Sequence, residues 1–398
     1  MKYDFETLTD RHGTNCIKWD LAASNDIIPM WIADMDFQVA PFIVDAVQRR
    51  LDHHVYGYVH VPDKYYDAVC SWFDRRYGWK IERNFIKYTI GVVPAISVAI
   101  HALAKPGEGV IVQTPAYNCF FSCVRNQGTK LLENPLRCTE KDGGLYYEMD
   151  YEDLEKKASD PCAKVFLLCN PHNPSGRCWT KEEMRKAAEI CRRHGVTVVS
   201  DEIHCEIVMP GHEFVPFATV SDEFAKDAII FNSPSKNFNI AGLQIANIIS
   251  GNAELAAKVD KVVNTFEVCD VNPFGVEALM AAYGVPGDAN YPVGPGEEWL
   301  RQMNATVYEN YKALCEALKP LTKFKVSNLE GTYLAWVNCA EAGLGGNEVQ
   351  DYLLKNNKVW VNGGAMYGDD RFFRVNLACP PSLAKEGIRR IAEGLSRL

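Results

Sequence analysis

The sequence predicts an α/β protein with a mostly parallel, doubly wound sheet in a large domain and a smaller α+β domain beside it. Between about residues 85 and 250, short β-rich runs alternate with amphipathic stretches, the pattern of strands covered by helices on both faces. After about residue 285 the chain passes through a segment rich in proline and glycine into a long helical pattern. We therefore expect a large domain over residues 46–284 and a discontinuous small domain over residues 1–45 and 285–398.

Local signals place the individual elements in chain order. Thr180 is a preferred N-cap residue and Glu183 completes a capping box with it. A helix is therefore expected from there to about His194, before Gly195. Strands are expected at 87–90, 109–113, 165–169, 196–200, 228–232 and 332–337, and further helices at 94–103, 116–126, 297–318 and 382–398.

Composition and charge exclude several classes of protein. Hydrophobic residues make up 47% and charged residues 23%, which excludes a disordered chain or a coiled coil. The net charge of −9 has the wrong sign for a general nucleic-acid binder. The chain shows no apolar run of about 20 residues and no signal-peptide pattern, so we expect a cytoplasmic protein without membrane contact. Its 14 cysteines form no C-x-x-C pair, and no metal is expected.

Conspicuous polar residues directly follow four of the expected strands. Ligands bind at this edge of an open α/β sheet, beyond the carboxyl ends of the strands. A glycine turn at 91–95 opens a helix, and a turn at 170–176 contains Asn173 between two prolines. Asp201 follows a third strand and Lys236 a fourth. One crevice would therefore hold a glycine turn, an amide, a carboxylate and an amine.

These groups match the parts of pyridoxal 5′-phosphate (PLP). The glycine turn at a helix N-terminus suits a phosphate, with the hydroxyls of Ser233 and Ser235 nearby. Lys236 suits either a further phosphate contact or a Schiff base with an aldehyde. Asp201 suits a protonated ring nitrogen, which makes a pyridine an electron acceptor. We therefore expect PLP as the cofactor.

The motifs that carry these groups resemble the fold type I PLP enzymes, the aspartate aminotransferase superfamily. The resemblance rests on Asn-Pro-x-Asn-Pro-x-Gly at 170–176, Asp-Glu-Ile at 201–203, Ser-x-Ser-Lys at 233–236 and Phe-Arg-Val-Asn at 373–376. Within the superfamily the chain resembles the MalY/PatB-type cystathionine β-lyase (carbon–sulfur lyase) branch. The strings that match this branch include Lys-Trp-Asp at 18–20, Met-Trp-Ile-Ala-Asp-Met-Asp-Phe at 30–37, Tyr-Gly-Tyr at 56–58 and Thr-Pro-Ala-Tyr at 114–117.

The resemblance implies a role for each matching residue. Lys236 would hold PLP in a Schiff base and then remove the substrate's Cα proton. Asp201 would pair with the ring nitrogen, and Asn173 would donate a hydrogen bond to the phenolic oxygen of the ring. Tyr117 would stack on the ring, and Arg374 would bind the α-carboxylate of an amino acid substrate with its planar guanidinium.

The resemblance also implies how the phosphate is bound and how the chain assembles. Tyr58 would reach the phosphate from the neighbouring subunit of a homodimer. His204 either contacts the cofactor or has only a structural role. The cradle of backbone amides would lie at Val93, Pro94 and Ala95, beside Ser233 and Ser235.

Two positions favour a lyase over a transaminase. His204 stands where many transaminases carry tyrosine, and Gln244 stands where many carry an arginine that binds the phosphate. The leading hypothesis is a PLP-dependent carbon–sulfur β-lyase that cleaves cystathionine or related cysteine S-conjugates to a thiol, pyruvate and ammonia. The alternative is a class I/II aminotransferase. A regulatory protein that keeps the fold without turnover is a third hypothesis, but Lys236, Asp201 and Arg374 are all retained.

Overall fold

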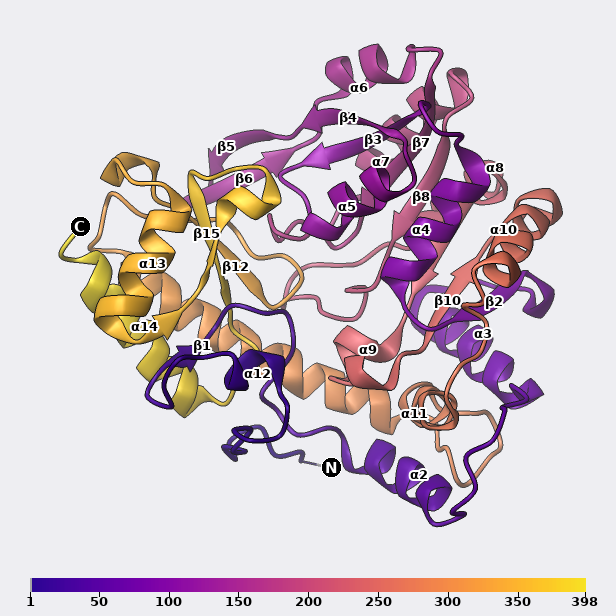
Figure 1. The fold of residues 1–398 in the computed structure, drawn as a ribbon, viewed down its shortest axis with the longest axis horizontal. Coiled ribbons are helices and arrows are strands. Elements are labelled where there is room, and N and C mark those ends of the chain that lie inside the picture. Colours follow the sequence, from indigo (N-terminus) through magenta and orange to yellow (C-terminus); the bar gives the residue numbers. More distant parts are fainter. Residues whose placement is uncertain (1) are drawn as a thin grey trace.

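A seven-stranded sheet forms the centre of the protein, whose residues 2–398 are described by a computed structural model (Figure 1). The strand order is β2-β10-β9-β8-β7-β3-β4, and β10 alone runs in the direction opposite to the other six strands. The predicted mostly parallel α/β fold is confirmed. The strands are β2 (Ile86–Thr89), β3 (Gly109–Thr114), β4 (Lys130–Pro135), β7 (Ala163–Cys169), β8 (Thr197–Asp201), β9 (Ala228–Asn232) and β10 (Ala246–Ile249).

Helices cover both faces of this sheet, because successive side chains of its central strands point into two different apolar cores. In β7, Val165 and Leu167 belong to one core, whereas Phe166 and Leu168 belong to the other. The first core is closed by α4 (Val92–Leu103), α5 (Asn118–Asn126) and α10 (Ala253–Thr265), and the second by α6 (Tyr151–Ala158), α7 (Lys181–Arg193) and α8 (Asp222–Lys226).

A third core joins the large sheet to the C-terminal part of the chain. It includes α2 (Pro41–Leu51), α3 (Asp63–Tyr77), α11 (Pro273–Tyr283) and the long α12 (Pro295–Leu318). The second sheet has the order β11-β12-β15-β14, with β11 (Lys325–Val326), β12 (Leu334–Asn338), β14 (Asn362–Gly363) and β15 (Phe372–Asn376). Helices α13 (Gly346–Asn357) and α14 (Pro381–Leu395) pack beside this sheet (Figure 1).

The N-terminal segment lies against the C-terminal part rather than against the large sheet. β1 (Ile28–Pro29) pairs in parallel with β13 (Val359–Trp360), and the short α1 (Ile17–Asp20) precedes it. In Figure 1 the indigo segment accordingly lies next to the orange and yellow elements. We propose on this contact that the segment before residue 46 belongs to the small domain, with the boundaries that the sequence predicts.

Most of the elements that the sequence predicted are present, with bounds that differ by one or two residues. The Thr180–Glu183 capping box is present at the start of α7, and Gly195 follows that helix with a φ of +68°. Many other elements were not predicted, among them the antiparallel β10 and the hairpin of β5 (Arg137–Lys141) and β6 (Gly144–Glu148). β5 is exposed along its whole length and β10 has only four residues, so neither carries a long apolar pattern.

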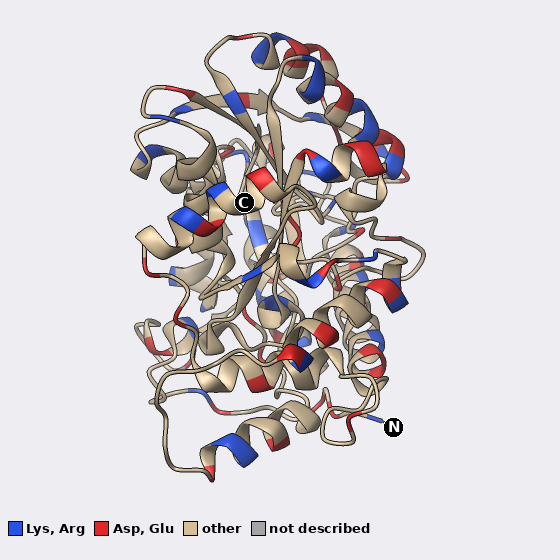
Figure 2. Cartoon of the chain, turned by 90° about the vertical axis from the view of Figure 1, so that its right-hand side faces the viewer, with Lys and Arg blue, Asp and Glu red and all other residues tan. Residues whose placement is uncertain are grey.

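Basic and acidic residues are interspersed along the helices in the coloured cartoon of Figure 2. On α7, for example, Arg185 pairs with Glu182 and Glu189. No helix among residues 2–398 has the length and apolar character needed to cross a bilayer. Within the same residues, no group of three or more His, Cys, Asp or Glu side chains is arranged to hold a metal ion.

Candidate active site

A cavity of about 360 Å³ lies at the carboxyl ends of the central strands, where polar residues were expected to meet. The last residues of β7 and β8, the start of α4 and the short α9 (Pro234–Asn237) all contribute to its wall. Of the predicted site residues, Val93, Pro94, Tyr117, Asn173, Asp201, His204, Ser235 and Lys236 line the cavity.

Lys236 lies on α9, immediately after β9, and its amine faces the cavity. Ser233 fixes the start of this helix, because its hydroxyl accepts a hydrogen bond from the amide of Ser235 (3.0 Å) and donates one to the carbonyl of Ile245 (2.6 Å). The Lys236 Nζ donates to the carbonyl of Ala33. Burial lowers the pKa of Lys236 to about 8, so that roughly one tenth of the amine is neutral at pH 7, far more than for an ordinary lysine, and able to attack an aldehyde.

Asp201 is the last residue of β8 and is 4% exposed. One carboxylate oxygen accepts a hydrogen bond from the amide of Ile203 (3.1 Å). Burial raises the pKa of Asp201 to about 7, and the Ile203 amide and the Lys236 charge oppose that rise. A carboxylate that burial destabilises in this way would be stabilised by a cation at the cavity wall, and a protonated ring nitrogen fits that requirement.

Arg374 lies on β15 and does not line the cavity itself, but it contacts Asn173, which does. Its guanidinium donates to the side-chain oxygen of Asn173 (3.0 Å) and to the carbonyl of Trp31 (2.9 Å), and it stacks 4.8 Å from the ring of Tyr367. Arg374 is 2% exposed, its Nε has no hydrogen-bond partner, and no carboxylate among residues 2–398 forms an ion pair with it. A buried guanidinium without a counter-ion fits the carboxylate of a ligand.

The expected phosphate end of the cavity lies at the N-terminus of α4, which Gly91 caps without a side-chain hydrogen bond. Val93 and Ser235 line the cavity here, and the 12 residues of α4 direct its amide end toward them. The structure corrects three expectations. Pro94 lines the cavity but has no N–H to donate, and the amide of Ala95 already donates to Gly91. Ser233 does not line the cavity, and its hydroxyl donates to the carbonyl of Ile245.

His204 lines the cavity as a neutral imidazole. It is 3% exposed, and burial lowers its pKa to about 3, helped by the charges of Lys236 and Arg374. Its ring meets that of Tyr333 edge-on at 5.9 Å, and its Nδ1 has no partner among the described residues. An unpaired, buried ring nitrogen at the cavity wall is an available donor or acceptor for a bound ligand.

The two tyrosines of the predicted site, Tyr117 and Tyr58, lie at different distances from the cavity: one lines it and the other does not. Tyr117 precedes α5 and lines the cavity, and burial raises its pKa well above the ordinary value. Tyr58 is fully exposed between α2 and α3 and does not line the cavity of this chain. Its expected contact with the phosphate of a second subunit therefore stays a prediction.

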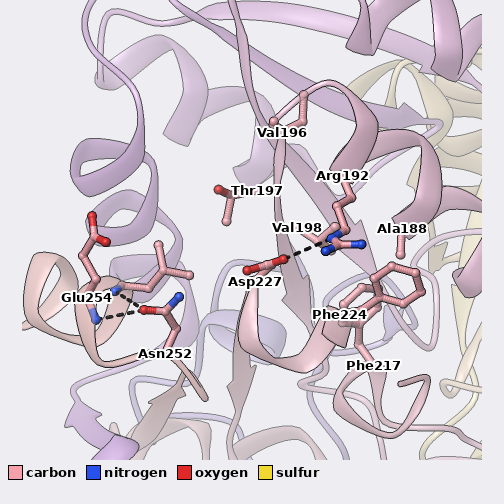
Figure 3. Close-up of a pocket in the computed structure, with 12 residues that line it drawn as sticks. Ala188, Arg192, Val196, Thr197, Val198, Phe217, Phe224, Asp227, Asn252 and Glu254 are labelled. Atoms are coloured by element: carbon pink, nitrogen blue, oxygen red, sulfur yellow. Dashed lines mark hydrogen bonds and ion pairs between the residues drawn. The ribbon is translucent and has the colours of Figure 1, made fainter. Parts of the chain in front are cut away.

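A second hollow lies at the opposite, amino-terminal edge of the strands, near Val196 and Thr197 (Figure 3). Its polar groups already have partners within the chain: Arg192 forms an ion pair with Asp227, and Asn252 caps α10. It brings together no amine and acid that could perform chemistry. The cavity at the carboxyl edge is therefore the candidate active site.

Comparison with known proteins decides the family. The model of the aminotransferase class I and II family matches residues 25–391. The chain belongs to this family. It is 40% identical over 400 residues to cystathionine β-lyase PatB of Bacillus subtilis, covering 99% of this chain and 100% of the relative. It is 30% identical over 397 residues to protein MalY of Escherichia coli, covering 97% of each.

Solved structures of similar proteins share the fold along the whole chain. Cystalysin from Treponema denticola, which contains a pyridoxal 5′-phosphate cofactor, aligns with a TM-score of 0.92 at 32% identity and full coverage of both chains. The PLP-bound C–S lyase from Staphylococcus hominis aligns with a TM-score of 0.88 at 30% identity, covering 99% of each chain. The predicted resemblance to fold type I enzymes and their lyase branch is confirmed.

In this family member, several residues near the cavity were not predicted as part of the site. Ala33 lines the cavity, and Trp31 holds Arg374 through its carbonyl. Tyr333 and Tyr367 contact His204 and Arg374 respectively. The motif at 30–37 marked this segment in the sequence, but only the folded chain brings it beside residues that lie hundreds of positions away.

Proposed function

We propose that the protein is a PLP-dependent carbon–sulfur β-lyase that cleaves cystathionine or related cysteine S-conjugates to a thiol, pyruvate and ammonia. The observation that carries the proposal is one cavity that holds the Lys236 amine, with its lowered pKa, and the buried Asp201 carboxyl. Full-length similarity to cystathionine β-lyase PatB and to C–S lyases supports the reaction class.

The residues present fit PLP. When bound, PLP would supply an electron-accepting pyridinium that stabilises negative charge at the substrate's Cα. Lys236 would bind its aldehyde carbon, and Asp201 would keep the ring nitrogen protonated. The α4 N-terminus with Val93 and Ser235 would hold the phosphate. Tyr117 would cover one face of the ring, with Asn173 and His204 at its edge.

The chain's own groups then account for the proton and charge transfers. Arg374 would bind the substrate carboxylate with its guanidinium, which has no counter-ion and one unpaired nitrogen, and orient the Cα–H bond toward Lys236. The neutral Nζ of Lys236 would remove the Cα proton, because its lowered pKa makes the free base available near neutral pH. The C–S bond would break with departure of the thiolate from Cβ, and Lys236 in its protonated form would be the nearest acid for that sulfur.

The test is an assay of the purified protein with cystathionine, in which pyruvate and free thiol are both measured. Lys236→Ala should abolish both products. Lys186→Ala, at an exposed position on α7, should leave them unchanged. Failure of the wild-type protein to form pyruvate and thiol would contradict the proposal.

The same residues would also serve the alternative, an aminotransferase, and His204 and Gln244 are the positions that favour the lyase. Gln244 lines the cavity and places an uncharged side chain where a phosphate-binding arginine would add a cation. An amino acid without a leaving group, such as alanine, distinguishes the two activities. Stoichiometric conversion of bound PLP to its pyridoxamine form, without lyase products from cystathionine, would favour transamination.

We further propose a homodimer in which Tyr58 reaches the phosphate site of the other subunit. The support is a run of exposed apolar side chains around the end of α2, including Leu51, Val55, Tyr56 and the fully exposed Tyr58. Light scattering would measure the mass of the assembly in solution. Tyr58→Phe should weaken PLP binding and leave the protein dimeric. The cytoplasmic location expected from the sequence is part of the same proposal, and cell fractionation would test it.

A further inference from the structure

Residues 31–36, here called the strap, cross the candidate site with their backbone carbonyls directed at functional side chains. The carbonyl of Trp31 accepts a hydrogen bond from Arg374 at 2.9 Å. The carbonyl of Ala33 accepts one from the Lys236 amine and another from the Tyr333 hydroxyl at 3.1 Å. The strap is therefore in direct contact with both the candidate base and the candidate carboxylate-binding residue.

Asn376 ties the strap to the small sheet. Its side-chain nitrogen, Nδ2, donates to the carbonyls of Ile32 and Asp34, at 2.6 Å each. Asn376 lies two residues after Arg374 on β15, so the same strand carries both the residue that fastens the strap and the residue that the strap contacts. A displacement of the strap would consequently change the surroundings of Lys236 and Arg374 together.

A charge cluster fixes the other side of the strap. The Lys18 amine, 1% exposed, lies 2.6 Å from the carboxylate of Asp36 and donates to the carbonyl of Asp34 at 3.1 Å. Arg11 binds the carboxylates of Asp34 and Asp36, at 2.7 Å each. The indole nitrogen of Trp19 donates to Asp36 at 2.8 Å. Lys18, Arg11 and Trp19 therefore all bind residues 34–36, the C-terminal end of the strap.

A buried ion pair of this kind is weak support for stability, because burying the two charges costs about as much as their attraction returns, and apolar replacements are often as stable. The pair instead fixes the position of the groups around it, since a buried ammonium must keep its carboxylate and carbonyl partners in place. The motifs at 18–20 and 30–37, which the proposed reaction leaves without a role, contain Lys18, Trp19, Asp34 and Asp36.

We propose that the Lys18–Asp36 ion pair is a positioning pair, which holds the strap so that the carbonyls of Ala33 and Trp31 orient the Lys236 amine and Arg374. The inference rests on the proposed function for the roles of Lys236 and Arg374, but not for the contacts themselves. Lys18 and Asp36 act through the strap and do not touch the cavity.

The experiment compares Lys18→Met with a matched control, Arg76→Met. Arg76 is more exposed than Lys18 (27% against 1%), but it pairs at 2.7 Å with Glu206, which is at least as buried as Asp36, and the pair lies away from the strap. Three quantities are measured: the melting temperature, the kcat and KM for cystathionine, and the rate constant with which cofactor-free protein forms a Schiff base with added PLP. Lys236→Ala supplies the blank for the last measurement.

Lys18→Met should raise KM and slow Schiff-base formation, each by about ten-fold, because the amine and the guanidinium lose their fixed orientation. Arg76→Met should lower the melting temperature and leave KM and the Schiff-base rate unchanged. If both variants change only the melting temperature, the positioning role is refuted. If Lys18→Met does not fold, Arg11→Met, at a partly exposed member of the cluster, should show the same changes in smaller measure, and wild-type values in that variant would overturn the proposal.

The outcome also separates this inference from the proposed function. A wild-type protein that takes up PLP without cleaving cystathionine would contradict the lyase. The comparison of Schiff-base rates between Lys18→Met and Arg76→Met would still decide whether the ion pair positions the amine.

Discussion

Replacing Asp201 by asparagine should stabilise the cofactor-free protein above neutral pH while disabling the proposed reaction. Burial raises the pKa of this carboxyl from 3.8 to about 7, which corresponds to roughly 4 kcal/mol against the charged form. The pKa of about 7 is already the net of burial against the Ile203 amide and the Lys236 charge, and asparagine, which is itself polar, recovers only part of the burial cost. We therefore expect the free energy of unfolding to rise by about 2–4 kcal/mol at pH 8 in the variant.

The stability difference between the Asp201→Asn variant and the wild type should depend on pH. Below about pH 4 the carboxyl is protonated in the folded and the unfolded protein, so wild type and variant should have similar stability. Between about pH 4 and 7 the unfolded chain has released the proton and the folded chain retains it, so wild-type stability falls as the pH rises. Above pH 7 the difference stays constant.

Urea unfolding of both cofactor-free proteins between pH 4 and 8 measures this difference. With PLP added, the variant should lose at least about a hundred-fold in cystathionine cleavage, because asparagine cannot hold the proton on the ring nitrogen by its charge. A variant no more stable than wild type at pH 8, or a stability gap that is unchanged at pH 4, would refute the assigned burial effect. Full activity in the variant would refute the pairing with the ring.

Three further outcomes are expected. Arg374→Lys should raise the KM for cystathionine by roughly a hundred-fold, because an ammonium cannot make a bidentate contact with the substrate carboxylate and leaves Asn173 or Trp31 without its hydrogen bond. Steady-state kinetics measure this change, and an unchanged KM would contradict carboxylate binding by Arg374. Schiff-base formation by cofactor-free protein should accelerate with pH and level off above about pH 8, where Lys236 is neutral, whereas a rate that kept rising beyond pH 10 would indicate an ordinary lysine. Thr180→Ala should cost about 1 kcal/mol of unfolding free energy in a denaturant titration and leave KM unchanged, since the capping box of α7 lies outside the cavity.

The candidate site was predictable where chemistry sits next to a recognisable local pattern. Asp201 and Lys236 each follow a short apolar run, and parallel strands bring their carboxyl ends to one edge of the sheet. Ala95 and Ser233 also lie at strand ends, yet their polar groups are used within the backbone. Spacing along the chain cannot distinguish a group that faces the cavity from one that completes a helical turn, since both positions have the same sequence pattern.

The sequence by itself determined the elements that carry strong local signals and the identity of the reactive groups, because capping, apolar periodicity and side-chain chemistry act over a few residues. Tertiary structure alone decided that Arg374 meets Asn173, 201 positions earlier, and that Ala33 receives the amine of Lys236, 203 positions later. It also decided the antiparallel direction of β10 and the placing of the N-terminal strand β1 on β13. Such contacts arise only when separate layers pack, because their partners are chosen by the shape and unpaired polar groups of distant segments rather than by neighbours in the chain.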